Sequence, residues 1–457
     1  MTGLKFLRRH IVGNLPSTCP ELFAWQKSHS ETLIDSLLVN GYAKDGSDTG
    51  TGKTVIALTV ARRLGLEPFI VCPKAVVPSW TEWAHKFLYS APQVFNYEKI
   101  RTGNTRYYAK NKQTKRAGRW SIDPAKTLLI FDEDHRCKSA KSENAKLMIA
   151  GKERGIPTLS LGATSCSNPV EMRALGYLLD MHNDAGWWNW CLKNGCKRGV
   201  FGGLTFRGYA SVLKRLHDHI YKDGRGSRIR IKDLPPGSFP ETLVIADGYN
   251  LGGDGSSNTD LIYRDMKAEL EALDLRRETD EDSALTIQLR ARQEVELLKV
   301  PIFEELTADA HASASSVVIF VNFRDTAQAL INRLSSLDEN IGFIGGHQNE
   351  FERQLEVNKF QRNDSRILIC MTQAGGTGLS LHDETGDFPR ISLISPSFSA
   401  IDLRQALGRV HRATGKSPSI QKIVFANDTV EMRVCKAVRE KLNNIDLIND
   451  DEMNPIL

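Results

Sequence analysis

Short apolar runs alternate with helical patterns along the first half of the chain. Strand-like runs occur at 68–73, at 127–134, where acids follow the apolar residues, and at 158–164. Apolar residues also recur at helical spacing, as in 53–65, where Gly65 closes the pattern. This alternation of strands and helices predicts a mostly parallel sheet with helices on both faces.

The second half repeats the pattern of strands and helices after a stretch of different composition. A proline-rich connector at 234–240 and a turn-rich stretch at 248–260 come first, followed by a charged helical segment at about 258–306 that we interpret as two helices. Five further strands are then predicted, at 316–323, 339–346, 365–372, 390–395 and 421–426. A chain of 457 residues suits two domains. We therefore predict two α/β lobes, residues 1–245 and 246–457.

Charge is distributed unevenly between these halves. Residues 1–245 hold 37 Lys and Arg against 21 Asp and Glu, a net charge of +16, whereas the remainder has a net charge of −11. A strongly basic half is typical of proteins that bind polyanions. Basic surface that only aids solubility is the alternative.

The cysteine content and the lengths of the apolar runs indicate where in the cell the protein is located. Eight cysteines are scattered at spacings that fit neither a disulfide framework nor a zinc site, and no apolar run is long enough to cross a membrane. No signal peptide is evident. We expect an intracellular protein, cytoplasmic in a bacterium or phage-infected host rather than nuclear, with no membrane partner.

The segment SDTGTGKT, residues 47–54, has the character of a phosphate-binding loop. Its glycines let backbone N–H groups curl around phosphate oxygens at the start of a helix. Lys53 is expected to reach the β- and γ-phosphates of ATP, and Thr54 to hold Mg²⁺. Ser47 departs from the strict pattern, which has glycine there, and a chance turn-to-helix junction is the alternative. The loop residues assigned to ATP binding are Thr49, Gly50, Thr51, Gly52, Lys53 and Thr54.

An acidic segment, Asp132-Glu133-Asp134-His135, ends the apolar run at 127–134. A carboxylate there can hold Mg²⁺ through water, and its neighbour can orient the attacking water, so we assign these roles to Asp132 and Glu133. The alternative is an acidic surface turn. Ligands of α/β sheets bind at the carboxyl ends of the strands, which favours the functional interpretation.

Together these segments resemble the superfamily 2 helicases with a DEAD/DEAH-type acid box, and more specifically the Swi/Snf-like branch. The resemblance spans about residues 20–435 and implies two tandem RecA-like lobes with ATP between them. Asp134 stands where the family has a small residue. Gln26 lies at the spacing of the adenine-reading glutamine, although a plain exposed glutamine is an alternative.

Further segments extend the resemblance. LGATSCSNP (161–169) stands where the family has a coupling motif, and SRIRIKDLPP (227–236) resembles a Swi/Snf segment in which basic residues precede Leu-Pro-Pro. Trp80 is assigned to the nucleic-acid backbone, with core packing as the alternative. The residues that the resemblance implies as nucleic-acid contacts are Lys74, Trp80, Lys99, Arg101, Asn322, Arg324, Thr372 and Gln373.

The second lobe is expected to complete the ATP site. Gly378 belongs to an Ala-Gly-Gly segment that the family shares, and we assign it to nucleotide binding. Arg409 and Arg412, three apart on a predicted helix, can point at one γ-phosphate and stabilise the charge that develops there. Gln405 would help to orient the water. A basic helix face with no target is the alternative.

An insertion at about 183–233 combines Trp187, Trp188 and Trp190 with many Lys and Arg residues. Aromatic side chains among basic ones can grip nucleic acid. A tryptophan cluster that only anchors the insertion to the core is the alternative.

The sequence predicts an ATP-dependent translocase that remodels duplex or branched DNA with little base specificity, because backbone contacts carry no base information. The expected cofactors are ATP and Mg²⁺, and replication or recombination proteins are possible partners. A strand-separating RNA or DNA helicase is the second interpretation. A non-motor, ATP-gated binding module is the third, with Ser47 and Asp134 as signs of decay.

Overall fold

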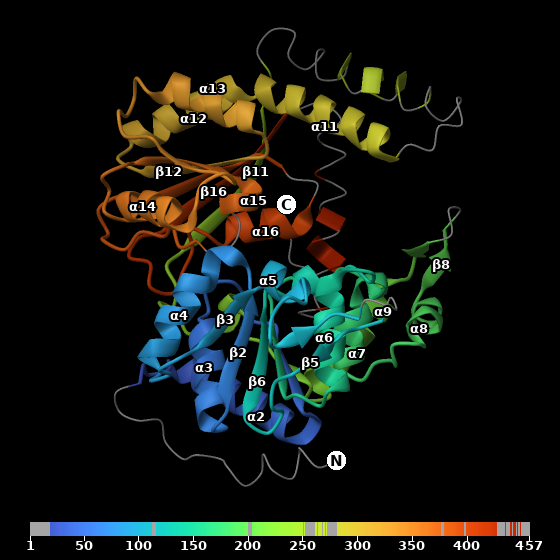
Figure 1. Cartoon of the computed structure of the whole chain (residues 1–457). Coiled ribbons are helices and arrows are strands. Elements are labelled where there is room, and N and C mark those ends of the chain that lie inside the picture. The colour runs from blue at the N-terminus through green and yellow to red at the C-terminus, as the bar shows by residue number, and fades with distance from the viewer. Residues whose placement is uncertain are drawn as a thin grey trace. The chain divides into compact units, whose positions relative to one another are not determined.

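A computed structural model describes residues 19–111, 116–199, 203–249, 251, 261–262, 264–266, 268–269, 271, 281–375, 379–396, 399–426, 435, 439–440, 442–444, 446 and 448. The chain forms two compact units that divide between Pro235 and Pro236, and the described residues from 443 to 448 group with the first unit. Each unit is an α/β domain built on one sheet (Figure 1).

The first unit contains a six-stranded sheet in the order β10-β1-β7-β6-β2-β3, with all neighbours parallel. Its strands are β1 (Tyr42–Asp45), β2 (Glu67–Cys72), β3 (Gln93–Asn96), β6 (Thr127–Asp132), β7 (Thr158–Leu161) and β10 (Gly226–Ser227). The flanking helices are α2 (Ala24–Asn40), α3 (Lys53–Arg63), α4 (Val77–Lys86), α5 (Tyr97–Arg101), α6 (Glu143–Glu153), α7 (Arg173–Leu178) and α9 (Ala210–His217).

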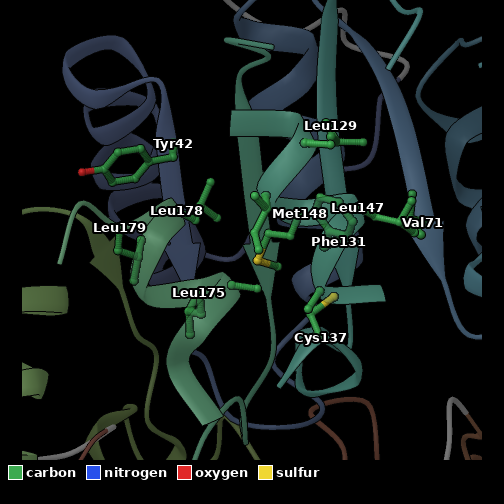
Figure 2. Packing of buried hydrophobic residues seen from close by; sticks show 14 of the residues in the cluster. Tyr42, Val71, Leu129, Phe131, Cys137, Leu147, Met148, Leu175, Leu178 and Leu179 are labelled. Carbon is green, nitrogen blue, oxygen red and sulfur yellow. The ribbon is translucent and has the colours of Figure 1, made fainter. Parts of the chain in front are cut away.

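Alternate residues along these strands supply two cores. Phe69, Val71, Leu129 and Phe131 face one side of the sheet, where they pack against α6, α7 and α9. Figure 2 shows this cluster, with Leu147, Met148 and Leu175 among the helical residues that cover the strands. Ile70, Cys72, Leu128 and Ile130 face the other side and pack against α2, α3 and α4. Burial on both faces explains why β2 and β6 read as continuous apolar runs.

The second unit repeats this architecture, with the strand order β11-β16-β15-β12-β14-β13 and parallel pairing throughout. Its strands are β11 (Thr242–Tyr249), β12 (Ser316–Val321), β13 (Gly342–Ile344), β14 (Ile367–Met371), β15 (Arg390–Ile394) and β16 (Ser419–Ala426). Its helices are α11 (Glu281–Leu298), α12 (Val300–Ala312), α13 (Arg324–Leu334), α14 (Glu350–Gln361), α15 (Thr372–Gly375) and α16 (Ala400–Leu407). Two tandem RecA-like lobes are thereby confirmed.

The expected boundary at residue 245 falls inside β11. That strand pairs with β16 along its whole length, so its residues belong to the second sheet, and the division lies at Pro235-Pro236 instead. The two helices expected at about 258–306 correspond to α11 and α12 in the described residues. They separate at Lys299, where Pro301 opens α12.

The insertion at about 183–233 holds α8 (Trp187–Lys193) and a small hairpin of β8 (Cys196–Arg198) and β9 (Leu204–Phe206). Both stand away from the central sheet of the first unit (Figure 1). Trp190 packs on the core beside α7, which supports the anchoring interpretation for that residue. Among the described residues, no helix is long and apolar enough to cross a membrane.

Candidate nucleotide site and nucleic-acid surface

The carboxyl edge of the first sheet gathers the predicted ATP-site segments. The phosphate loop follows β1, the segment from Leu161 follows β7, and the acid box follows β6. Because β1, β7 and β6 are successive parallel strands, these three segments meet at one edge. Ligands of α/β sheets bind at such an edge.

The phosphate loop has the backbone that its glycines predict. Gly50 and Gly52 have φ angles of 85° and 87°, in the left-handed region that favours glycine, and Gly52 begins helix α3. Thr54 lies in the first turn of that helix, where N–H groups have no partner within the helix. Lys53 Nζ donates to the carbonyl oxygens of Ser47 and Asp48, at 2.9 Å each. The loop therefore holds its lysine at the place where phosphate is expected.

Gln26 packs against the loop from α2. Its Nε2 donates to the Thr51 carbonyl at 2.9 Å, and its Oε1 accepts from Phe23 N at 2.9 Å. A β-carbon on Gly52 would lie 2.5 Å from Gln26 Nε2, so a larger residue there would displace the glutamine side chain. The exposed-glutamine alternative is wrong, because Gln26 is buried. Its adenine-reading role stays a prediction.

A buried polar cluster contacts the phosphate loop on its interior side. His29 Nε2 lies 3.2 Å from Asp45 Oδ1 and 3.3 Å from Ser47 Oγ, and Asp45 Oδ1 also accepts from Ser47 N. Ser47 Oγ accepts from Ile229 N at 3.0 Å. Burial acts to raise the pKa of Asp45, but the charge and hydrogen bond of His29 hold it well below its usual range. Ser47, where the family has glycine, thus has a structural role.

The basic segment at 227–236 contacts the phosphate loop directly. Arg228 Nη2 pairs with Asp48 Oδ1 at 2.8 Å, and Arg228 also donates to the Gly46 carbonyl. Ile231 N donates to Asp48 Oδ2 at 2.9 Å. Sequence reasoning missed this role for Arg228 and the supporting role of His29, because both contacts join segments that are distant in the sequence.

The acid box ends β6 in a tight turn. Asp132 Oδ1 accepts from Glu133 N at 3.0 Å. Burial and then repulsion from Glu133 raise the pKa of Asp132 to about 6. Glu133 has a φ angle of 53°, a left-handed conformation that costs a non-glycine residue on the order of 1–3 kcal/mol. Such a conformation persists only where the surroundings enforce it.

Lys53 and the acid box share one electrostatic environment. Burial lowers the pKa of Lys53, while the nearby carboxylates of Asp45, Glu133 and Asp132 act to raise it. Lys53 in turn acts to lower the pKa of Asp132. The arrangement fits Mg·ATP, because Thr54 and Asp132 offer a hydroxyl and a carboxylate of the kind that Mg²⁺ uses alongside phosphate oxygens.

Three exposed basic side chains of the first unit lie at the same sheet edge. Lys74 follows β2, and Lys99 and Arg101 lie on α5 after the neighbouring strand β3. All three are exposed, so each can reach a phosphate.

Trp80 was assigned to the nucleic-acid backbone, and the structure corrects this. Its side chain is only 2% exposed and packs in the core formed by α2, α3 and α4. Its Nε1 donates to Asp132 Oδ2 at 2.8 Å. Trp80 therefore supports the acid box from behind rather than contacting nucleic acid.

The corresponding positions of the second unit differ in accessibility. Arg324 and Gln373 are exposed, at the ends of the neighbouring strands β12 and β14. Thr372 is buried and its hydroxyl donates to the Val321 carbonyl at 3.0 Å, so its side chain does not face a phosphate as predicted. Asn322 Nδ2 donates to Glu296 Oε2 at 2.7 Å and to the Pro396 carbonyl at 3.2 Å.

Glu296 is a second residue that sequence reasoning missed. It is buried on α11 and accepts hydrogen bonds from Asn322 N, Phe323 N and Ser395 Oγ. One carboxylate thereby ties the ends of β12 and β15 together. A single Glu in a charged helical segment gives no sequence signal of this kind.

The two predicted arginines converge, although not on a helix. Helix α16 ends at Leu407 with Gly408 as its C-cap, so Arg409 and Arg412 lie beyond the helix. Arg409 Nη1 and Arg412 Nη2 each donate to the Leu379 carbonyl at 3.1 Å. Gln405 is buried in α16. Gly378 lies outside the described residues.

Comparisons with known proteins identify helicases as relatives of this chain. The model of the helicase conserved C-terminal domain matches residues 298–414. "Putative ATP-dependent RNA helicase L364" of Acanthamoeba polyphaga mimivirus is 32% identical over 95% of this chain and 85% of its own length. "ATP-dependent helicase FUN30" of Saccharomyces cerevisiae is 29% identical over 30% of this chain and 12% of its own length.

A solved structure, "Sulfolobus solfataricus SWI2/SNF2 ATPase core in complex with dsDNA", is 14% identical over 90% of both chains, with a TM-score of 0.35. The assignment therefore rests on the sequence relatives and on the two observed sheets. The chain belongs to superfamily 2 of the helicases, with relatives in the Swi/Snf-like branch, and is a nucleic-acid-dependent ATPase.

Proposed function

We propose that this protein is an ATP-driven translocase that moves on duplex or branched DNA with little base specificity. The observation that carries the proposal is the position of Lys53 among Asp132 and Glu133 at one sheet edge, in a helicase-family chain. That arrangement supplies a cation for phosphates and a carboxylate for water, which are the requirements of phosphoryl transfer.

The residues of the proposed site fall into two groups, those that bind ATP and those that act in its hydrolysis. Lys53 and the N–H groups at the start of α3 bind the phosphates. Glu133 accepts a hydrogen bond from the attacking water and orients it. Thr54 and Asp132 would hold Mg²⁺, which would supply positive charge to offset that of the phosphates. Arg409 and Arg412 are proposed to stabilise the charge that develops on the γ-phosphate.

Duplex DNA is the proposed track because the first half carries a net charge of +16 and the sequence has Swi/Snf-like segments. Replication forks and recombination intermediates are branched DNAs of this class. RNA is the second candidate, because a relative that matches 95% of the chain is named an RNA helicase. Exposed Lys74, Lys99 and Arg101 suit the phosphates of either nucleic acid.

ATPase measurements with different nucleic acids test the proposal. We expect duplex DNA and a four-way junction to raise kcat at least about tenfold above the rate without nucleic acid, and more than single-stranded DNA or RNA does. Each nucleic acid is compared at saturation and at one salt concentration, because phosphate binding weakens with salt. Stimulation by RNA alone would make RNA the substrate. No stimulation by any of them would rule out a motor.

Arg412→Ala is expected to lower the stimulated kcat about 100-fold while the Kd for ATP changes less than about threefold, because an arginine of this kind acts mainly on the transition state. The matched control is Arg362→Ala, which removes an exposed arginine of the same unit. Stimulated turnover and ATP titration are measured on both. Loss of ATP binding with Arg412→Ala would instead indicate a structural role.

A further inference from the structure

Lys44 and Asp134 form a buried ion pair beneath the candidate ATP site. Lys44 Nζ lies 2.9 Å from Asp134 Oδ2, and each side chain is 1% exposed. Lys44 Nζ also donates to the carbonyls of Gly162 at 2.8 Å and Asp45 at 3.1 Å. The ammonium group therefore has three acceptors for its three hydrogens. A lysine in the middle of a parallel sheet requires such compensation.

Asp134 makes one further hydrogen bond and lies close to Gly162. Its Oδ2 accepts from Ser160 Oγ at 2.5 Å. Its Oδ1 lies where a side chain at position 162 would begin, because a β-carbon added to Gly162 would overlap it. Gly162 thus makes room for the carboxylate that replaces the small residue of the family pattern. Lys44, Asp134 and Gly162 depend on one another, and we call them the acid-box anchor.

The acid-box anchor joins three segments of the ATP site. Lys44 precedes Asp45, which accepts from Ser47 N in the phosphate loop. Gly162 opens the predicted coupling motif after β7. Asp134 directly follows Glu133, whose φ angle of 53° needs an external restraint. The acid-box anchor thus fixes Asp134, the residue after Glu133, against the segments that carry Lys44 and Gly162.

We propose that Lys44 and Asp134 are positioning residues for ATP hydrolysis, which hold the left-handed turn that aims Glu133 at the attacking water. The inference rests on the proposed role of Glu133. Neither residue contacts ATP in this scheme. They act through the backbone of Glu133, and through Gly162 they connect that backbone to the coupling motif.

A double-mutant cycle tests the pair. Lys44→Met and Asp134→Ala each leave one buried charge without its partner, so each should lower the Tm, whereas the double variant should recover most of that loss. The double variant no longer restrains Glu133. Its stimulated kcat should be at least about tenfold below that of the parent, with the KM for ATP changed less than about threefold. A double variant with the parent's kcat would overturn the proposal.

Gly162→Ala supplies a second, independent measurement. When it is made in the parent protein, the β-carbon that Gly162→Ala adds displaces the Asp134 carboxylate. The kcat should therefore fall while the KM for ATP stays the same. In the Lys44→Met/Asp134→Ala background the overlapping oxygen is gone, and the same change should lower kcat no further. An equal loss in both backgrounds would overturn the proposal, even if a single charge variant fails to fold.

Two controls separate this inference from the proposed function. The cycle Arg173→Met/Asp184→Ala removes another ion pair of the same unit and should leave kcat at the parent's value. Glu133→Gln is measured in parallel. Full turnover with Glu133→Gln would refute the proposed site itself. An inactive Glu133→Gln together with a fully active double variant would refute only the positioning role.

Discussion

Replacing Glu133 with glutamine is expected to lower the stimulated ATP turnover at least about 100-fold while ATP still binds, because a positioned general base commonly contributes two to four orders of magnitude. Glutamine has the size of glutamate and keeps the backbone turn at position 133. It removes the negative charge that would hold the attacking water and accept its proton. A carboxylate oxygen of Glu133 also lies 3.3 Å from His135 Nδ1, and the glutamine amide can make the same contact.

Steady-state kinetics and ATP titration measure the two parts of this prediction separately. The kcat should collapse, and the Kd for ATP should change less than about threefold, since the carboxylate acts mainly in the transition state. Glu153→Gln, at an exposed position at the end of α6, is the matched control. A Glu133→Gln protein that keeps near-parental turnover would show that another group orients the water.

The sequence could predict the strands that are buried on both faces. β2, β6 and β12 are buried and apolar along most of their length, as expected where helices cover both faces of each sheet. β1 gave no such signal, because Lys44 and Asp45 lie inside it. Their charges are compensated by Asp134 and His29, which are distant in sequence. A charged strand is therefore stable only in a tertiary context that a local pattern does not contain.

The same reasoning separates the residues of the candidate site. The phosphate loop and acid box were predictable because their chemistry depends on neighbouring residues in one short segment. Trp80 and Thr372 were assigned by resemblance to nucleic-acid contacts, yet each is buried with its polar hydrogen donated inward. The burial of Trp80 depends on how α4 packs on the first sheet, and that of Thr372 on how α15 continues from β14 beside β12. Motif spacing carries no information about that packing.

Lys53→Ala is expected to abolish turnover because it weakens ATP binding, whereas Glu133→Gln leaves ATP binding largely intact. Lys53 is the cation among Asp45, Asp132 and Glu133, which all interact with it. Without it these acidic groups would repel the phosphates, and the loop would lose the ammonium group that Ser47 and Asp48 hold in place. We expect the Kd for ATP to rise at least about tenfold, which corresponds to about 1.4 kcal/mol of binding free energy.

Binding of ATP and of duplex DNA is measured on the same Lys53→Ala preparation. DNA binding without nucleotide should be retained, because the exposed lysines and arginines at the sheet edge are unchanged. Lys86→Ala, at an exposed position on α4, controls for the loss of one positive charge. Normal ATP affinity with Lys53→Ala would mean that the nucleotide binds elsewhere. Weak ATP binding in Lys53→Ala and normal binding in Glu133→Gln would assign binding to the phosphate loop and chemistry to the acid box, although the two lie at one sheet edge.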